Sequence, residues 1–443
     1  MSSILIKNAE YLVTMDKKRR ILRNSSVYIE GPEIKEVNTQ REKADKVINA
    51  SGMVVLPGFI NCHHHMFQSL FRNVPYLQNQ RIDRWITGMM AMGQEVTPEA
   101  SYWSAMTAIA ELLLSGCTTT ADFFYVSPEN KEEILEMIIK AAEDIGMRLH
   151  LYQESEALIE KYHQSGRFSM LRIGLGICAP FTKPKRDFEK IAKLARRYGV
   201  NLQIHVAESE FEVNYCLEKY GKRPVFYLQE IDWKNHDVSY VHCIYLDKEE
   251  IKALGWSKTC VIHCPISNAR GEGIAPVTEM LEEGVIVGIG VDGSAGNDSS
   301  NILEEMRWAR TLQGARPGFT YLKSSEVLEM GTIGGARVLG RDDIGSIEVG
   351  KAADIAVFDP RNKISHAGAV CDPVGSLITS QAIPAEYVIV NGKIVVEKGT
   401  LKTIDLNDIV RRQNKYARET VEKAERKTGK PLNKIVWKKA VKS

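Results

Sequence analysis

The two ends of the chain carry short runs of alternating apolar and polar residues, which predict β-strands. In the N-terminal part, Gly31-Pro32 and Gly52 break three such runs, which lie at 4–15, 27–37 and 46–56. In the C-terminal part, one run covers 354–359, and 387–397 is typical of a hairpin around Asn391-Gly392. Two β-rich ends around a different middle predict one small β-sandwich domain built from residues 1–56 and 346–404.

Between about residues 57 and 345, short apolar runs alternate with stretches in which apolar residues recur at helical spacing, such as 98–115 and 187–198. Eight runs are candidate strands, at 54–62, 118–124, 148–152, 171–178, 201–205, 238–242, 260–263 and 285–292. Eight strands alternating with helices predict an α/β fold, a closed (β/α)8 TIM barrel. Residues 405–443 are expected to form one amphipathic helix, to about 428, and a solvated basic tail that carries Lys434, Lys438, Lys439 and Lys442.

The composition is that of a globular protein and excludes several classes of partner. The chain has 443 residues, 44% hydrophobic and 26% charged, with 58 Lys and Arg against 56 Asp and Glu. This balance gives no long-range field for a nucleic acid polymer or an anionic membrane, so a small substrate is expected. We find no apolar run of about 18 residues and no signal-peptide core. The 8 cysteines form no CxxC pair, which favours reduced thiols and a cytoplasmic location.

Histidines gather at the predicted C-terminal ends of the barrel strands, which form the catalytic face of this architecture. Five of the 10 histidines lie there, namely His63, His65, His205, His242 and His263. A lone histidine is more often a packing residue than a ligand. Five of them, together with Asp292, are hard to explain as core filling.

His63 and His65 stand two residues apart on one predicted strand, so both imidazoles point to the same face while His64 points to the other. This HxH pattern is weak evidence for a metal by itself, and it gains weight from later residues. His205 would supply a third nitrogen ligand and leave an open site suited to water. Glu208, three residues further on, is placed to shuttle a proton, although alone it would be a surface glutamate.

Two further residues close apolar strands. His242 is either a ligand in a two-metal site or a hydrogen-bond donor to an oxygen on the metal. A carboxylate such as Asp292, after so apolar a strand, is costly unless it is paired or bound to metal, and it suits both a weak ligand and a general base. A bound divalent cation can lower the pKa of water from about 15.7 to about 7. Imidazole and carboxylate ligands suit zinc, iron or manganese, and the sequence does not choose between them.

The motifs of this chain resemble those of the amidohydrolase superfamily. Within it they are similar to the group of triazine hydrolases, cytosine and guanine deaminases and 8-oxoguanine deaminases, of which the last are closest in motifs. They run in the family's order over nearly the whole chain. The motifs are PGFINCHHHMFQSLFR, ELLLSGCTTTADF, IHVAESEFEV, YVHCIYLD, IHCPISNARGEGIAPV, GIGVDGSAGNDSSN and GSIEVGKAADIAVFD.

The resemblance implies one metal ion, because the fourth strand, LRIGLGICAP, lacks the lysine that bridges two metals in other members. It implies a ligand set of His63, His65, His205 and Asp292. It also implies that Glu208 is the proton shuttle, with His242 the partner of the attacking hydroxide. Gln68 matches a glutamine that contacts the ring of the substrate. Trp85 matches an aromatic that packs near the substrate, although a core tryptophan explains it equally well.

Together these features predict a zinc enzyme, with iron as the alternative metal, that deaminates an amino-substituted N-heterocycle and releases ammonia. The expected substrates are 8-oxoguanine, isoxanthopterin, guanine or a related oxopurine or pterin. A hydrolase of an s-triazine or of a cyclic amide on the same scaffold is the alternative, and a non-catalytic ligand-binding barrel is a remote one. The presence of both Glu208 and Asp292 favours deamination, because an ammonia leaving group needs protons. A homo-oligomer is expected on family grounds only.

Overall fold

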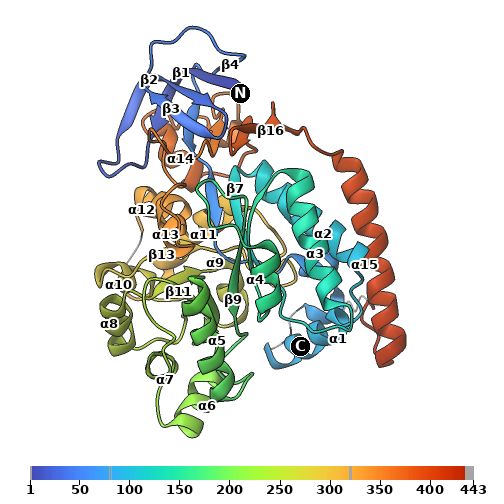
Figure 1. Cartoon of the computed structure of the whole chain (residues 1–443). Coiled ribbons are helices and arrows are strands. Elements are labelled where there is room, and N and C mark those ends of the chain that lie inside the picture. The colour runs from blue at the N-terminus through green and yellow to red at the C-terminus, as the bar shows by residue number, and fades with distance from the viewer. Residues whose placement is uncertain (1, 79, 81, 319–321, 435–443) are drawn as a thin grey trace, which may run out of the picture.

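A computed structural model describes residues 2–78, 80, 82–318 and 322–434. Two sheets organise these residues, a closed eight-stranded parallel barrel and a separate nine-stranded sheet (Figure 1). The α/β barrel predicted from the sequence is confirmed, as is the second β-domain assembled from both chain ends.

The barrel strands follow one another in chain order, each parallel to its neighbours, and the last pairs with the first. They are β6 (Phe59–Asn61), β7 (Cys117–Phe123), β8 (Arg148–Tyr152), β9 (Leu171–Gly176), β10 (Leu202–Val206), β11 (Val238–His242), β12 (Cys260–His263) and β13 (Val287–Ile289). Because all eight run the same way, their C-terminal ends meet at one mouth of the barrel.

Helices follow the strands and surround the barrel (Figure 1). They are α1 (Ile82–Gly93), α2 (Pro98–Leu114), α3 (Lys131–Ile145), α4 (Glu156–Tyr162), α5 (Lys185–Tyr198), α6 (Glu210–Tyr220), α7 (Pro224–Glu230), α8 (Lys248–Ser257), α9 (Pro265–Gly271), α10 (Val277–Glu282), α11 (Ile302–Ala315), α12 (Ser324–Glu329) and α13 (Gly335–Val338). Local signals fix their ends. Thr97 caps α2 by accepting a hydrogen bond from the amide of Ala100, and Pro98 occupies the first turn.

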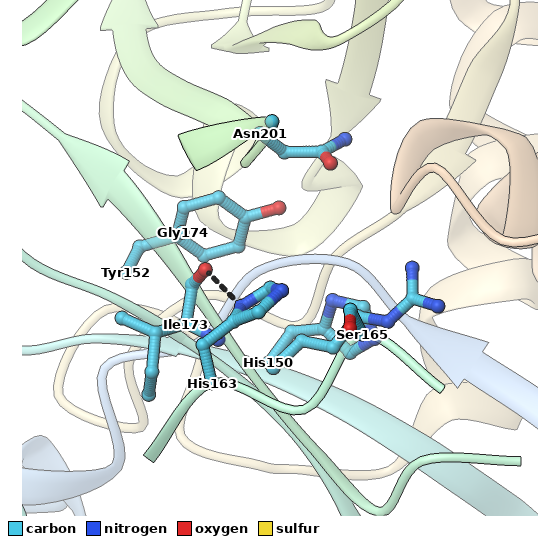
Figure 2. Close-up of a pocket in the computed structure, with 9 residues that line it drawn as sticks. His150, Tyr152, His163, Ser165, Ile173, Gly174 and Asn201 are labelled. Carbon is cyan, nitrogen blue, oxygen red and sulfur yellow. Dashed lines mark hydrogen bonds between the residues drawn. The ribbon is translucent and has the colours of Figure 1, made fainter. Parts of the chain in front are cut away.

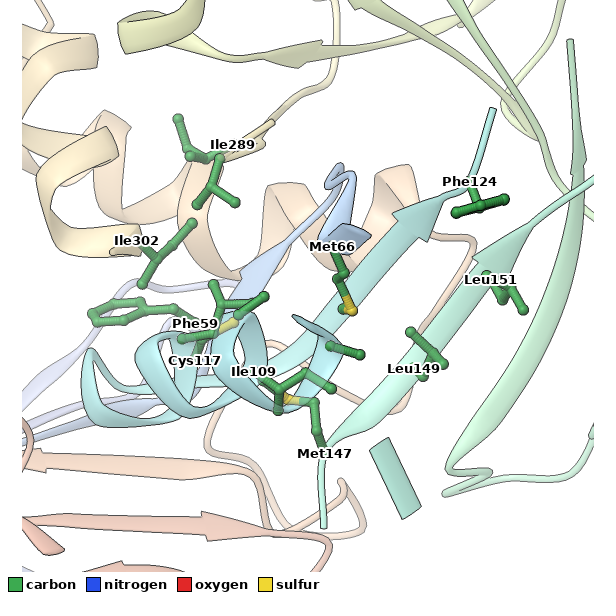
Figure 3. Close-up of a cluster of buried hydrophobic side chains, with 14 of the residues drawn as sticks. Phe59, Met66, Ile109, Cys117, Phe124, Met147, Leu149, Leu151, Ile289 and Ile302 are labelled. Atoms are coloured by element: carbon green, nitrogen blue, oxygen red, sulfur yellow. The ribbon is translucent and has the colours of Figure 1, made fainter. Parts of the chain in front are cut away.

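The main core lies between the outer face of the barrel and these helices. Figure 3 shows Ile109 of α2 in one cluster with Phe59, Cys117 and Leu149 from three successive strands, all fully or almost fully buried. Because side chains alternate between the two faces of each strand, the residues next to these in sequence point into the barrel. A second cluster is formed there by residues such as Phe123.

The second sheet joins strands from the two ends of the chain in the order β17-β16-β15-β14-β5-β1-β2-β3, with β4 paired to β1. Their bounds are β1 (Ser3–Val13), β2 (Ile21–Glu30), β3 (Glu33–Val37), β4 (Lys46–Asn49), β5 (Val54–Pro57), β14 (Ile355–Phe358), β15 (Tyr387–Val390), β16 (Lys393–Glu397) and β17 (Thr400–Leu401). The antiparallel pairing of β5 with β14 connects the two halves. One hydrogen-bonded sheet thus packs around a hydrophobic core of its own.

The run expected as the first barrel strand, 54–62, is divided between the two sheets. Its first part is β5 and its second part is β6. Gly58 separates them, and its amide bonds to the carbonyl of Asp354 at 2.9 Å. A Cβ atom at position 58 would lie 2.1 Å from Thr118, so only glycine allows this close crossing.

The expected C-terminal helix is present as α15 (Leu406–Thr428), which lies along α2, while the short α14 (Pro373–Thr379) packs against α11 and α12. Lys423 and Lys427 of α15 reach the buried carboxylate of Glu95 at 3.0 and 2.7 Å. Of the predicted tail, Lys434 is exposed, whereas Lys438, Lys439 and Lys442 lie outside the described residues. Within the described part of the chain, none of the helices has the length and apolar character needed to cross a bilayer.

Candidate metal centre at the barrel mouth

Three imidazoles converge at the C-terminal ends of strands β6 and β10. The Nε2 atom of His63 lies 3.2 Å from Nε2 of His65 and 3.2 Å from Nε2 of His205. Nε2 of His65 and Nε2 of His205 are 3.3 Å apart. No hydrogen-bonding side chain fits between three nitrogen atoms that lie so close to one another.

The opposite nitrogen of each ring is held by an acceptor, which fixes the tautomer. Nδ1 of His65 lies 2.5 Å from the carbonyl of Phe123, and Nδ1 of His205 lies 2.6 Å from that of Cys178. Nδ1 of His63 lies 2.6 Å from Oε1 of Gln203, whose amide group donates in turn to the carbonyl of Cys62. Because these oxygens only accept, each Nδ1 donates and each Nε2 keeps its lone pair for the shared centre.

Asp292 brings a carboxylate to the same centre. Its Oδ1 atom lies 3.5 Å from Nε2 of His63 and 3.3 Å from Nε2 of His65. Its other oxygen accepts a hydrogen bond from Ser267 at 2.5 Å. The backbone adopts a left-handed φ of 58° at Asp292, and its amide bonds to the carbonyl of His63. Such conformations are uncommon outside glycine and are found at functional sites.

We call His63, His65, His205 and Asp292 the mouth cluster, and its geometry fits a divalent metal. Ligand atoms about 2.1 Å from a zinc ion at tetrahedral angles lie about 3.4 Å from one another. Five of the six separations in the cluster, all except that between His205 and Asp292, run from 3.2 to 3.5 Å. Three neutral imidazoles and one carboxylate form a donor set suited to zinc or iron.

Protonation favours the same conclusion. Burial, together with the other histidines, lowers the pKa of His65 to about 3 and holds the pKa of His205 well below its usual range. Burial opposes ionisation of Asp292, but the surrounding imidazoles hold the pKa of this carboxyl well below its usual value. The cluster therefore presents uncharged nitrogens and one anion, as metal ligands must.

Glu208 and His242 form a second pair beside the cluster. Oε1 of Glu208 lies 3.6 Å from Nε2 of His242, and the His242 ring stacks on that of His205 with centroids 5.3 Å apart. Nδ1 of His242 lies 2.8 Å from Oδ1 of Asn268. Burial raises the pKa of Glu208 above its usual value, as suits a group that carries a proton.

Glu212, in the first turn of helix α6, stabilises the segment that carries Glu208. Its carboxylate accepts hydrogen bonds from the amides of Ala207 at 2.7 Å and Glu208 at 3.3 Å. Ala207 has a positive φ of 49°, a conformation that this bond helps to maintain. Glu212 thus positions Glu208 without facing the mouth cluster.

Gln68 lies on the rim of the same site. Its amide donates to the hydroxyl of Tyr125 at 3.0 Å, and the Tyr125 ring packs edge-on against His65 with centroids 4.7 Å apart. Oε1 of Gln68 is buried and has no hydrogen-bond partner among the described residues. It lies against Gly293, where an added Cβ would stand 1.9 Å away. The free acceptor therefore lies beside the residue that follows Asp292 in the chain.

Trp85, His64 and His263 take no part in these contacts. Trp85 is on α1, partly buried against the main core, and its contact with substrate stays a prediction. Nε2 of His64 bonds to Ser300 at 3.0 Å, pointing away as its strand position suggested. His263 is fully buried, and neither of its ring nitrogens has a hydrogen-bond partner among the described residues.

The sequence analysis missed the residues that hold the site in place. Gln203 stands two residues before His205, so the same period-two rule that pairs His63 with His65 could have found it. Ser267 and Asn268 were within a quoted motif, but their spacing carries no such signal. Glu212 lies on the first turn of α6 and Tyr125 on the loop after β7, and only the folded structure reveals that both reach the site.

Comparisons with known proteins show the family of this chain. The amidohydrolase family matches residues 54–395. The chain is 35% identical over 396 residues to an 8-oxoguanine deaminase of Pseudomonas aeruginosa, covering 83% of this chain and 88% of that protein. It is 32% identical over 440 residues to a 5-methylthioadenosine/S-adenosylhomocysteine deaminase of Pelotomaculum thermopropionicum, covering 94% and 98%.

A solved structure gives the same result. Atrazine chlorohydrolase TrzN from Arthrobacter aurescens TC1, in complex with zinc, is similar with a TM-score of 0.88 and 29% identity, over 94% of this chain and 100% of that chain. The resemblance inferred from the motifs is thus confirmed. This chain belongs to the amidohydrolase family of hydrolytic enzymes.

Proposed function

We propose that this protein is a metal-dependent aminohydrolase that deaminates an amino-substituted oxopurine or pterin, with 8-oxoguanine as the first substrate to test. One observation carries the proposal. Two separate carboxyl groups face one site, Asp292 in contact with His63 and His65, and Glu208 in contact with His242. Hydrolytic release of ammonia needs both a base that accepts a proton from water and an acid that returns protons to the substrate.

The mouth cluster would hold one ion, zinc before iron. A divalent ion bound there supplies a Lewis acid that brings the pKa of a water molecule toward neutrality. Asp292 is placed to accept the proton that this water loses. Its second oxygen is anchored by Ser267, so the carboxylate keeps its orientation while the first oxygen faces the imidazoles.

Glu208 handles the protons on the substrate side. It donates a proton to the ring nitrogen next to the carbon under attack, and Asp292 returns to the exocyclic amine the proton that it took from water. The C–N bond then breaks, ammonia leaves with the electron pair of that bond, the added hydroxyl returns its proton to Glu208, and the lactam remains. His242, held through Nδ1 by Asn268, keeps Nε2 directed toward the oxygen that adds.

Gln68 supports a planar heterocycle as the substrate. Its free acceptor, beside Gly293, can receive a hydrogen bond from a ring N–H, and an amide at this position reads the edge of a ring. The 35% identity to an 8-oxoguanine deaminase supports an oxopurine in this position. The 32% identity to a 5-methylthioadenosine/S-adenosylhomocysteine deaminase places amino-purine nucleosides among the substrates to test.

An s-triazine is the second candidate, because the fold is so similar to that of atrazine chlorohydrolase TrzN. A chloride leaving group needs no proton, whereas ammonia does, so an acid at Glu208 favours an amino-triazine over a chlorinated one. The two candidates therefore share one reaction, replacement of an amino group by oxygen.

The test is a screen for ammonia release by the full chain loaded with zinc or iron. The panel contains 8-oxoguanine, guanine, isoxanthopterin, 5-methylthioadenosine and an amino-substituted hydroxytriazine, with the Glu208→Gln protein as the matched control. We expect the fastest turnover with an oxopurine or pterin. If the metal-loaded protein releases ammonia from no compound of the panel, the proposal is wrong.

A further inference from the structure

A cavity of about 130 Å³ opens at the opposite end of the barrel from the mouth cluster. It lies along strands β8, β9 and β10 and is closed by the segments that precede β9 and β10. Figure 2 shows the side chains of His150, Tyr152, His163 and Asn201 gathered around it. Such a space is too small for a nucleoside or other drug-sized ligand, which fills about 300–1,000 Å³, but it can hold a small ion.

The Tyr152 hydroxyl lines this cavity without a partner. The side chain is 1% exposed, and its oxygen makes no hydrogen bond within the described part of the chain. The ring reaches this position because residue 174 is glycine, since an added Cβ there would stand 2.4 Å from the ring. A buried hydroxyl left unpaired costs stability, so a ligand that accepts its proton is the simplest explanation for its retention.

Arg172 brings a positive charge to the same space. It is partly buried and donates from Nε to Ser169 Oγ at 3.2 Å and from Nη1 to the carbonyl of Gly340 at 3.3 Å. Among the described residues, no carboxylate lies within 4.0 Å of its guanidinium. Burial and the neighbouring Arg341 lower the pKa of Arg172 to about 10, although the charges of Asp343 and Asp342 oppose this shift.

The nearby acids are already engaged. Asp343 binds Arg341 through two hydrogen bonds of 2.7 and 2.8 Å. Asp354 binds Arg148 through two of 3.1 Å. Asp342 is exposed and forms no ion pair with the described residues. Each of the two buried pairs is neutral, so neither leaves a carboxylate free to pair with Arg172.

The histidine on β8 adds a donor. Nε2 of His150 lies 3.4 Å from a terminal nitrogen of Arg341, which can only donate, so His150 accepts there and carries its proton on Nδ1. That nitrogen has no hydrogen-bond partner among the described residues. His163 is fixed on the other side of the cavity through Nδ1, 3.1 Å from the backbone of Ile173 (Figure 2).

We propose that this lower cavity is a binding site for a small oxyanion of the size of phosphate or sulfate, held by the Arg172 guanidinium, the Tyr152 hydroxyl and the His150 Nδ1–H group. All three groups donate hydrogen bonds, and no acidic side chain lines the cavity. Proteins bind oxyanions where a charged donor and neutral donors converge on one space. The site does not depend on the metal centre, because it lies on the other end of the strands.

The test measures thermal unfolding and binding calorimetry of the full-length, metal-loaded protein with inorganic phosphate. Chloride at equal ionic strength is the reference, and sulfate is the second probe. We expect a saturable rise of Tm with phosphate or sulfate and none with chloride. Arg172→Gln should weaken the affinity at least ~10-fold, whereas Arg172→Lys, which keeps the charge, should retain most of it. Arg186→Gln removes a cation from a side chain that is 86% exposed and should change nothing.

Tyr152→Phe keeps the test decisive if Arg172→Gln does not fold, because it removes a single oxygen. Without phosphate its Tm should equal or exceed that of the wild type, since an unpaired hydroxyl is lost. With phosphate its gain in Tm should be smaller than the wild-type gain. The proposal is overturned if neither phosphate nor sulfate raises Tm above chloride. It is also overturned if Arg172→Gln and Tyr152→Phe show the full wild-type rise, which would place the anion at the metal.

Discussion

The two ends of the barrel solve the same problem, the burial of polar side chains, in opposite ways. At the C-terminal mouth, the lone pairs of three imidazoles point at one another, and only their far sides are hydrogen-bonded by the protein. At the other end, Arg148 and Asp354 are both almost fully buried and satisfy each other directly. Buried polar groups that pair with each other stabilise a fold. Buried polar groups that converge without pairing require a ligand.

The largest expected effect is at the mouth cluster. His65→Ala removes one of three nitrogen ligands, so the protein should lose its metal and with it all measurable activity. Asp292→Asn should lower kcat by ~10⁴-fold, because this carboxylate serves both as ligand and as base. Elemental analysis and ammonia release measure both outcomes. Two metals per chain, both needed for activity, would contradict the single-ion site.

At the opposite end, Asp354→Asn should unfold the protein more readily without touching the chemistry. It leaves Arg148 buried without a charge partner, which typically costs about 3–5 kcal/mol. Urea unfolding measures the loss, and metal content per folded chain should stay unchanged. Glu249→Gln is the control, since this exposed pair with Lys252 should contribute little to stability. Loss of metal in Asp354→Asn would show that the two ends are coupled.

Glu208→Gln tests the proton shuttle alone. Glutamine keeps the shape of the side chain but cannot transfer a proton, so kcat should fall by at least ~10²-fold while the metal stays bound. Glu212→Gln is a useful second variant, because it disturbs only the turn that carries Glu208 and should have a smaller effect. Near-normal ammonia release by a metal-replete Glu208→Gln protein would rule out this mechanism.

The contrast between the two ends also explains what the sequence could predict. The order of the strands and the placement of His63, His65 and His205 at their ends follow from local periodicity, which a sequence displays directly. The supports of the site do not, because Ser267 and Glu212 lie on the helices α9 and α6, whose positions beside the site are set by tertiary packing. The left-handed backbone at His242, with a φ of 74°, is likewise imposed by tertiary contacts.

The division of the run 54–62 between two sheets is a further case. Its residues are apolar apart from Asn61, and a nearly continuous apolar run is the pattern of one buried strand. Only the approach of Thr118 to Gly58 shows why the chain must change sheets there. The ion pairs below the barrel were equally hidden, since Arg148 and Asp354 are 206 positions apart.

The smallest effect is expected at Gln68, where the mouth meets the substrate. Its amide is oriented by the Tyr125 hydroxyl, and its oxygen is buried against Gly293 without a hydrogen-bond partner among the described residues. Gln68→Ala should lower kcat/KM by roughly 5–10-fold, the value of one hydrogen bond to a neutral ring, and leave metal content and Tm intact. Tyr125→Phe should act in the same direction but less, because it removes only the group that orients the amide. Steady-state kinetics with the best substrate of the panel measure both variants. Unchanged kinetics in Gln68→Ala would make this residue structural, and the assignment to deaminases of oxopurines would lose the one contact that reads the ring.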